Sequence, residues 1–425
     1  MIDMVGIGPF ITLPFIVGLM QGPMAIWAWL LGALLAYMDG MVWAEMGAQW
    51  PEAGGSYVFL KNLFKGNIFG KLLPFLFIWQ TIIQAPLVVA SGAIGFSHYL
   101  TFLIPLGDVG KKVVSGSLVI LIVALLYRDI KSIGKVSVVL SVITIGTILW
   151  LILSGISHWD KLPAMQFVPA GLHLDTLLFV ALGQSSLKAV YSYLGYYNVC
   201  HLGAEIINPQ KNIPRAIFIS ITGIALLYLG MQLSVLCVLP WQQVATSDFV
   251  VSTYFQHIYS HLAGQVATVL ILLIALASLF SVILGYSRIP YAAARNGDFF
   301  PVFGRLHPTR HFPHISLLAI GSLAFIFSLL FKMKEIITAI IIMRILIQFV
   351  SQAVGIILWH YRKQQSQLPY RMPLFPLPAI ISIIIWLFIF ISSPPIYWLY
   401  AFSIIGLGTI LFLIKEYRNR AQYIE

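Results

Sequence analysis

The sequence is poor in charge, and this excludes most soluble folds. Of its 425 residues only 9% are Asp, Glu, Lys or Arg, whereas a soluble domain carries about 25%. Only 14 residues are acidic, while 60% of the chain is hydrophobic. So few charges could not cover a core of this size with a polar surface. We therefore expect an all-α polytopic membrane protein.

Several other features that would identify a function are absent. The two cysteines, Cys200 and Cys237, both lie in apolar segments, which excludes a disulfide framework and a cysteine-rich metal centre. The ten histidines show no HExxH spacing, and no Walker-type glycine loop is present. The basic residues behind the net charge of +11 are scattered, which argues against nucleic acid as a partner. Without a catalytic constellation we expect no enzyme, no cofactor and no metal.

Long apolar runs make up most of the chain, and about 20 helical residues span a bilayer. About 12 transmembrane helices fit this length, separated by segments that carry glycine, proline and charge. The predicted spans are Asp3–Met20, Met24–Gly47, Leu72–Leu100, Val113–Tyr127, Val136–Ser154, Asp175–Leu202, Ala216–Leu239, Val266–Ser287, Ile315–Phe331, Ile336–His360, Ala379–Ile391 and Tyr397–Ile414.

The distribution of basic residues predicts the orientation of these spans. If both termini are cytoplasmic, most of the 25 Lys and Arg residues fall on the inner side, as the positive-inside rule requires. Five of them fall on the outer side, and two lie within spans. The outer five are Lys111, Lys112, Lys161, Lys332 and Lys334, and the two within spans are Lys188 and Arg344.

Two spans contain sequence that argues against a continuous helix. In the first, Gly6 and Gly8 weaken the helix and Pro9 removes an amide donor. In the second, Gly195 follows a run of tyrosines. Freed amides at a half-helix attract a carboxylate and freed carbonyls attract a cation, so two facing breaks suit a zwitterion. The alternative is that Gly6 and Gly8 only allow close helix packing.

Four motifs resemble the amino acid–polyamine–organocation transporter family. They lie in order along most of the chain and are specific jointly. They are Ala44-Glu45-Met46-Gly47 with Pro51-Glu52-Ala53-Gly54-Gly55-Ser56-Tyr57; Gly195-Tyr196 with Glu205, Asn208-Pro209 and Asn212-Ile213-Pro214-Arg215-Ala216; Ser287-Arg288 with Ala294-Arg295-Asn296-Gly297-Asp298; and Tyr370-Arg371-Met372-Pro373-Leu374-Phe375-Pro376.

This resemblance implies the leucine-transporter fold, in which two inverted five-helix repeats enclose the site and helices one and six are broken. It implies a transport core over residues 1–360, with helices one to five at about 3–154 and six to ten at about 175–360. Two further helices would occupy residues 361–425. It implies an amino-acid-like substrate and alternating access.

By position, the resemblance also implies the residues that bind the substrate. Val5, Gly6, Ile7 and Gly8 match the glycine-rich segment that binds the carboxylate. Tyr191 matches an aromatic residue whose carbonyl receives the ammonium group. The segment continues through Ser192, Tyr193, Leu194 and Gly195. Ile7 replaces a small or hydroxyl residue, so a side-chain contact there would be lost.

Charged residues at membrane depth are candidates for coupling. Asp39, Lys188 and Arg344 lie within spans and could form a proton-responsive pair or contact substrate. The alternative is a set of fixed ion pairs or an outward-reaching lysine. Many relatives carry a lysine in helix five that replaces sodium; the matching position is near Thr144, and the chain has no lysine there. Proton and sodium coupling both stay open.

The cytoplasmic helix ends carry four further charges, Glu45, Glu205, Arg288 and Arg295. They could close an inner gate by salt bridging, or they could be solvated helix-end charges worth up to about 1 kcal/mol each.

We interpret the chain as a secondary transporter, a symporter or an exchanger, of a neutral amino acid. Among the mid-span residues only Asp39 could hold an extra ammonium group, which disfavours a polyamine or a cationic amino acid, although the tyrosines near Gly195 keep that alternative open. A membrane nutrient sensor without turnover is the alternative from another class.

Three expectations concern the surroundings of the protein. The loop 101–112 has no cysteine, so we expect no disulfide-linked accessory subunit. The short termini favour a bacterial inner membrane. Only five residues precede Gly6, so either the natural start lies upstream or the inner half of helix one is missing.

Overall fold

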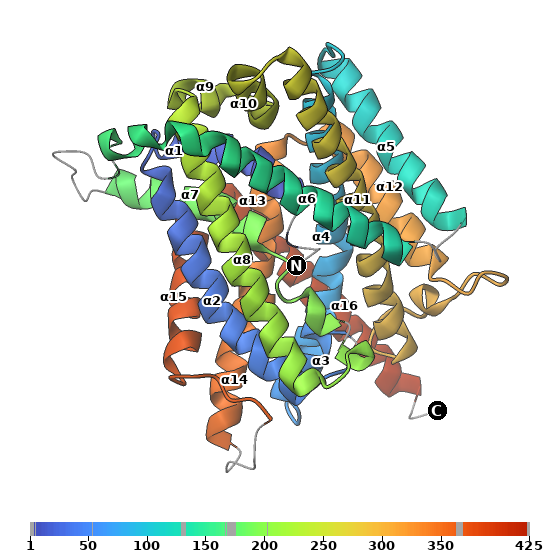
Figure 1. The fold of residues 1–425 in the computed structure, drawn as a ribbon. Coiled ribbons are helices and arrows are strands. Elements are labelled where there is room, and N and C mark those ends of the chain that lie inside the picture. The colour runs from blue at the N-terminus through green and yellow to red at the C-terminus, as the bar shows by residue number, and fades with distance from the viewer. Residues whose placement is uncertain are drawn as a thin grey trace.

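The computed structural model describes Met4 and residues 6–52, 54–128, 133–165, 167, 176–201, 203–362 and 369–422. These residues form a bundle of helices, and no strand occurs among them (Figure 1). The helices are α1 (Gly8–Leu19), α2 (Ala25–Gln49), α3 (Ser56–Leu63), α4 (Phe69–Leu100), α5 (Asp108–Arg128), α6 (Ile133–Gly155), α7 (Thr176–Tyr193), α8 (Pro209–Val238), α9 (Trp241–Thr246), α10 (Val250–Ile258), α11 (His261–Arg295), α12 (His314–Leu330), α13 (Met333–Arg344), α14 (Ser351–Arg362), α15 (Leu377–Ser392) and α16 (Pro395–Gln422).

The twelve predicted spans are confirmed. Eight segments of the described chain are long and apolar enough to cross a membrane, and three shorter apolar helices join them; with α7 they match the spans one for one. One span comprises α13, a π-helical stretch (Ile345–Val350) and α14. The protein is therefore an integral membrane protein of the expected all-α class.

Element boundaries differ from the prediction where helices leave the apolar layer. The helix α8 begins at Pro209 rather than Ala216, and α11 extends to Arg295, because a helix continues through the polar interface where hydropathy no longer marks it. The connection 240–265, which has no apolar run long enough to span, holds α9 and α10. Their apolar faces, with Val250, Val251 and Phe255 buried, pack on the bundle.

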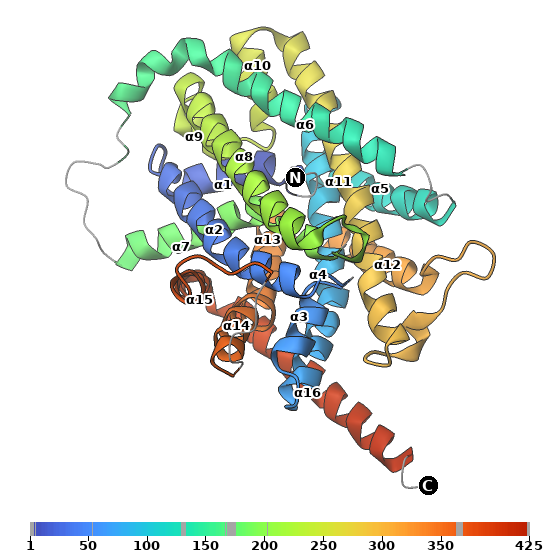
Figure 2. The ribbon, with the colours of Figure 1, turned by 60° about the horizontal axis from the view of Figure 1, so that its bottom comes forward.

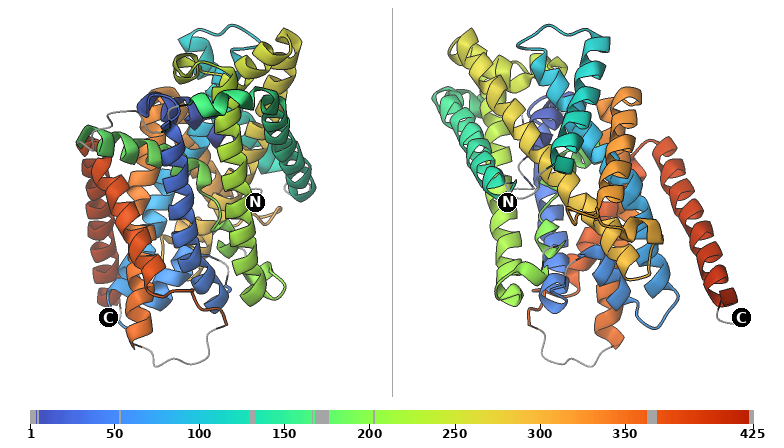
Figure 3. Two further views of the ribbon diagram at one scale, coloured as in Figure 1. Left: turned by 60° about the vertical axis from the view of Figure 1, so that its left-hand side comes forward. Right: turned by 90° about the vertical axis from the view of Figure 1, so that its right-hand side faces the viewer.

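Contacts between helices follow the expected inverted repeat. The pairs that occupy equivalent positions in the two halves contact each other: α1 with α7, α2 with α8, α4 with α11 and α5 with α12. The helix α4 also contacts α13 and α16 and lies well inside the bundle (Figure 2), whereas α16 lies at its edge (Figure 3).

A cluster of charges holds one end of the bundle, near α9 and α10. The carboxylate of Asp248 lies 3.3 Å from His98 Nδ1 and 3.2 Å from Lys111 Nζ. The hydrogen bond from His98 lowers the pKa of Asp248 to about 2, so this carboxylate stays ionised at any physiological pH. The cluster ties the segment before α10 to α4 and α5.

The close approach of α2 to its neighbours depends on glycine. A Cβ atom on Gly47 would lie 2.8 Å from Cys200 Sγ and 2.9 Å from Ile213 Cγ2. Both neighbours are fully buried and have no free space to move into. Gly47 therefore sets the distance between α2, the segment after α7, and α8.

We predict that Gly47→Val lowers the stability of the folded protein by about 1–3 kcal/mol, because overpacking a tight contact displaces backbone. The measurement is the unfolding midpoint in detergent. Gly406→Val is the matched control: Gly406 is exposed on α16 with no atom within 4 Å of its Cβ position. Equal midpoints for the two variants would contradict the prediction.

Candidate functional site

The helices α1 and α7 contact each other, and the start of α1 meets the end of α7. A Cβ on Gly8 would lie 3.4 Å from Tyr191 Cε1 and 3.7 Å from Ser192 Cα. The hydroxyls of Thr12 and Ser192 are 2.7 Å apart and hydrogen-bonded. The N-terminus of one helix thus lies directly against the C-terminus of the other.

Among the described residues the helix stops at both predicted breaks: α1 begins only at Gly8, and α7 ends at Tyr193. Gly6 and Ile7 form bends before α1 begins at Gly8, with Pro9 in its first turn, where a missing amide costs nothing. After α7 ends at Tyr193, residues 194–197 form turns, and Gly195 has φ +115°. Val5 lies outside the described residues.

These breaks place opposite partial charges side by side. The first amides of a helix and its last carbonyls have no partner within the helix. They carry the positive and the negative end of the helix dipole, respectively. At the meeting point of α1 and α7, free amides of the Gly6–Gly8 segment and free carbonyls at the end of α7 can therefore bind a carboxylate and an ammonium group.

Tyr228, on α8, supports both breaks. Its hydroxyl donates to Met4 O at 2.9 Å and to Ser192 O at 3.2 Å, so one side chain contacts the chain before α1 and the last turn of α7. The side chain is fully buried. The sequence analysis missed Tyr228; its only signal was a tyrosine hydroxyl inside an otherwise apolar span.

Two further helices complete the surroundings of the breaks. A Cβ on Gly6 would lie 2.6 Å from Ser278 Oγ of α11. On the α4 side, the Ser91 hydroxyl is 2.7 Å from the Tyr191 hydroxyl. Gly6, Gly8, Tyr191 and Ser278 all keep accessible surface, although helices surround them. Ser278 was missed by sequence reasoning too, and a single serine after a long apolar run was its only signal.

The other residues predicted for the second break occupy different surroundings. Tyr193 is buried between Trp29 and Tyr228, with ring centroids 6.0 and 5.4 Å away. Its side chain therefore packs in the scaffold. Ser192 is buried, and its hydroxyl is hydrogen-bonded to that of Thr12. Leu194 is half-buried in the turn.

Asp39 and Arg344 hold the turn after α7 from two sides. Asp39 is fully buried and accepts hydrogen bonds from Tyr196 OH at 2.5 Å and Trp386 Nε1 at 3.3 Å. Arg344 donates to Tyr197 OH at 2.8 Å. Consecutive tyrosines of the unwound segment are thus fixed by a carboxylate and a guanidinium group.

Arg344 has further neutral partners where α13 passes into its π-helical stretch. It donates to the Gln348 side chain and to Tyr286 OH, the latter at 3.3 Å. Its guanidinium also lies over the Tyr197 and Phe349 rings, 5.3 and 5.7 Å from their centroids. Among the described residues neither Asp39 nor Arg344 has an oppositely charged group within 4.0 Å.

Lys188 lies apart from this network. It donates to Lys334 O at 3.2 Å and to the Thr338 hydroxyl, both on α13. Lys188 therefore forms no ion pair with Asp39 in the described part of the chain. Asp39 and Arg344 contact the turn after α7, whereas Lys188 lies within α7, just before its last turn, and contacts α13.

Of the four charges proposed for the inner gate, Glu45, Arg288 and Arg295 form no ion pair with one another in the described part of the chain. Glu45 is fully buried, bonds the His360 ring and accepts from the Met372 amide at 2.8 Å. No ion pair of Arg288 or Arg295 occurs in the described part of the chain. The side chain of Glu205 lies outside the described residues.

A different ion pair joins α3 to the segment that follows α11. Lys61 Nζ lies 2.7 Å from Asp298 Oδ2, and Tyr57 donates to the same oxygen. Asn296 Nδ2 donates to Tyr57 OH at 3.3 Å. Burial raises the pKa of Tyr57, which keeps its hydroxyl protonated as a donor. Two of the motifs noted in the sequence, around Tyr57 and Asp298, therefore contact each other.

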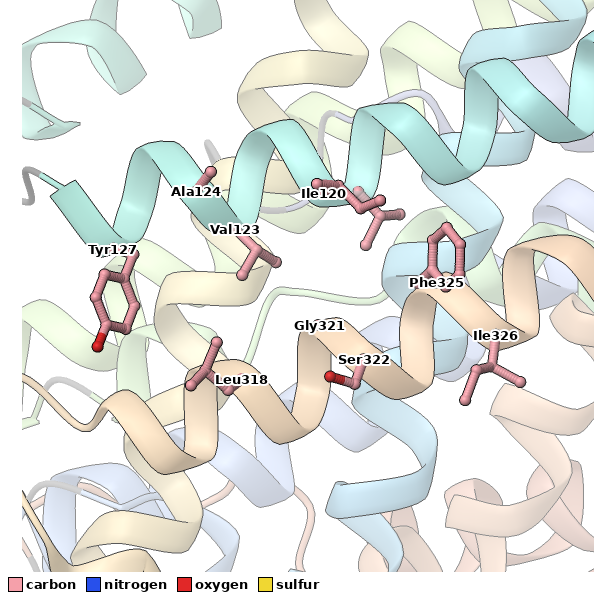
Figure 4. Close-up of a pocket in the computed structure, with 10 residues that line it drawn as sticks. Ile120, Val123, Ala124, Tyr127, Leu318, Gly321, Ser322, Phe325 and Ile326 are labelled. Carbon is pink, nitrogen blue, oxygen red and sulfur yellow. The ribbon is translucent and has the colours of Figure 1, made fainter.

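A large groove lies elsewhere, between α5 and α12. It has a volume of about 780 Å³ and is lined mainly by aliphatic and aromatic side chains such as Val123 and Phe325 (Figure 4). It has few polar groups, and it is distant in sequence from both breaks. No group of three or more metal-ligating side chains occurs among the described residues.

Comparison with known proteins agrees with this geometry. The family model described as amino acid permease matches residues 1–410. The serine/threonine exchanger SteT of Bacillus subtilis (strain 168) is 24% identical, over 85% of this chain and 80% of its own length. The methylthioribose transporter of the same organism is 23% identical, over 98% and 90%. The branched-chain amino acid permease BcaP of Lactococcus lactis subsp. cremoris (strain MG1363) is 26% identical, over 87% and 82%.

These relatives are named for transport and not for catalysis. The match covers both broken helices and almost the whole chain. The chain therefore belongs to the amino acid permease family and is a membrane transporter of amino acids.

Proposed function

We propose that the protein moves a neutral amino acid across the cytoplasmic membrane by alternating access, as a symporter or an exchanger. The observation that carries this proposal is the meeting of α1 and α7 at Gly8 and Ser192. The substrate carboxylate would bind the amides of Val5, Gly6, Ile7 and Gly8. The ammonium group would bind carbonyls of the last turn of α7, from Tyr191 onward, and the Tyr191 ring would cover the substrate.

The absence of nearby charge supports a neutral side chain. No carboxylate or basic group contacts Gly6, Gly8 or Tyr191 among the described residues. Asp39 is already engaged by Tyr196 and Trp386. Two of the relatives are named for serine, threonine or branched-chain amino acids, which are all uncharged in their side chains.

The transport core in this proposal is residues 1–360, with 361–425 as a C-terminal addition. The distribution of Lys and Arg supports cytoplasmic termini in a bacterial inner membrane. The cytoplasmic charges Glu45, Glu205, Arg288 and Arg295 stay candidates for the inner gate, which would pair in a conformation other than the one described.

Asp39 is the strongest candidate for proton coupling. Both of its oxygens bind neutral donors, so it could gain a proton without breaking an ion pair. Its partner Tyr196 lies in the turn that must move when α7 rearranges. Protonation of Asp39 would loosen this turn. Lys188 and Arg344 stay alternative coupling candidates, and sodium stays an alternative ion.

Substrate specificity is tested by counterflow. Proteoliposomes loaded with unlabelled serine, leucine, arginine or putrescine are diluted into each labelled compound, and we expect accumulation with serine or leucine only. Accumulation of arginine or putrescine would favour the cationic alternative. Binding without accumulation of any compound would favour a sensor.

We predict that Gly6→Ala lowers uptake by about 10–100-fold, since shifting a binding segment by about 1 Å costs this much. The added Cβ would lie 2.6 Å from Ser278 Oγ. The double variant Gly6→Ala, Ser278→Gly removes this clash and should restore most uptake. Gly285→Ala, on α11 with open space at its Cβ position, is the control. Failure of the double variant to recover would place the substrate elsewhere.

We predict that Asp39→Asn abolishes the response of uptake to an imposed proton gradient. The side-chain amide of the variant keeps its oxygen as an acceptor for Tyr196 OH but cannot accept from Trp386 Nε1. Losing this hydrogen bond lowers the stability by about 1 kcal/mol, which leaves the fold intact. Asp248→Asn makes the same chemical change outside the spans and should leave the response unchanged. The measurement is initial uptake with and without an inward proton gradient; an unaltered gradient response in Asp39→Asn would assign coupling to another group.

A further inference from the structure

A second pocket lies beside α1 and α7, where Leu187 and Lys188 come before the last turn of α7. Its volume is about 220 Å³, and it is bounded by α1, α7, α13 and the connection from α15 to α16. Ten residues line it: Phe15, Leu19, Gln184, Leu187, Lys188, Lys334, Thr338, Ser393, Pro394 and Tyr397. The apolar members cover one part of the wall, and the two lysines supply the charge.

Lys188 is buried in this wall with 7% of its surface exposed. Its ammonium group uses two donors, on Lys334 O and on the Thr338 hydroxyl. Within the described part of the chain no carboxylate lies within 4.0 Å of it. The charge that acts on it is a second cation, Lys334, which repels it. A buried ammonium group without a counter-ion is costly, so an anion that binds beside Lys188 would stabilise its charged form.

The acidic residue closest in sequence to Lys334 is already engaged. Glu335 accepts a hydrogen bond from the Lys332 amide at 3.0 Å and closes the first turn of α13. It does not line the pocket.

We propose that this pocket binds a small monocarboxylate with a short apolar chain, its carboxylate at Lys188 and Lys334 and its chain against Phe15, Leu19 and Leu187. A free amino acid is a weaker ligand here, because no carboxylate of the described lining residues could receive its ammonium group.

Binding at this pocket would oppose transport, and this part rests on the proposed function. The pocket walls come from both broken helices and from α13. A ligand that contacts all three stabilises the conformation in which they form the pocket. The monocarboxylate would therefore act as an inhibitor that does not compete with substrate.

The test uses the full-length purified protein in detergent, with thermal unfolding as the readout. Isovalerate at constant ionic strength should raise the unfolding midpoint, because a ligand that binds only the folded state stabilises it. Isovaleramide, which has the same shape and no charge, should not. An equal effect of the two compounds, or no effect of isovalerate, would overturn the proposal.

Variants of the lining residues test whether isovalerate stabilises the protein by binding in this pocket. Lys188→Met should abolish the stabilisation by isovalerate, and Lys332→Met, at an exposed lysine that does not line the pocket, should preserve it. Should Lys188→Met fail to fold, Leu19→Trp fills the pocket from its half-exposed rim without removing charge and should abolish the effect equally. Stabilisation that persists in every folded pocket variant would contradict the site.

A reciprocal measurement distinguishes binding in the second pocket from binding at the meeting point of α1 and α7. Leucine should stabilise Leu19→Trp but not Gly6→Ala, whereas isovalerate should stabilise Gly6→Ala but not Leu19→Trp. Loss of the leucine effect alone would count against the proposed function, and loss of the isovalerate effect alone would count against the second pocket.

Discussion

The hydroxyl of Tyr228 is the contact on which the two broken helices depend. A main chain that leaves its helix in the middle of a bilayer exposes polar groups that hydrocarbon cannot satisfy. Tyr228 donates to Met4 O and to Ser192 O, and so it supports the chain on both sides of the meeting point. Because it belongs to neither broken helix, α8 acts as a fixed reference against which α1 and α7 are positioned. The remaining free amides and carbonyls are then left for a ligand.

The turn after α7 is held by two buried charged side chains that bind its tyrosines. Asp39 and Arg344 are buried charges of opposite sign, yet they do not pair directly; each binds one of two consecutive tyrosines. A direct ion pair would leave the tyrosine hydroxyls without partners. Placing Tyr196 and Tyr197 between the charges satisfies all four groups and fixes the turn next to Gly195. A change in the charge of either Asp39 or Arg344 therefore acts on the backbone geometry of this turn.

Sequence reasoning predicted the local features and missed those that depend on distant contacts. Gly6, Gly8 and Pro9 weaken a helix wherever they stand, so the first break was predictable, and Gly195 indicated the second. The partners of Asp39 were not, since Tyr196 and Trp386 follow it by 157 and 347 residues. For Glu45 the sequence left open a salt bridge at an inner gate or a solvated charge at a helix end. In the structure Glu45 bonds His360 and a backbone amide. Ser278 gave no signal beyond one hydroxyl in an apolar run, because only the three-dimensional approach of α11 to Gly6 gives it importance.

The inner end of the bundle contains two polar contacts of unequal strength, and this inequality suggests where it opens. The pair Lys61–Asp298 is part exposed, and such pairs contribute about 0–1 kcal/mol. The contact of Glu45 with His360 is buried, and leaving a buried hydrogen-bonding group without its partner costs about 1–3 kcal/mol. A movement that separates α3 from the segment after α11 would therefore cost less free energy than one that separates α2 from α14. In this conformation the contact through Tyr57, Lys61 and Asp298 is the weaker of the two, and Glu45 has to leave His360 before it can pair elsewhere.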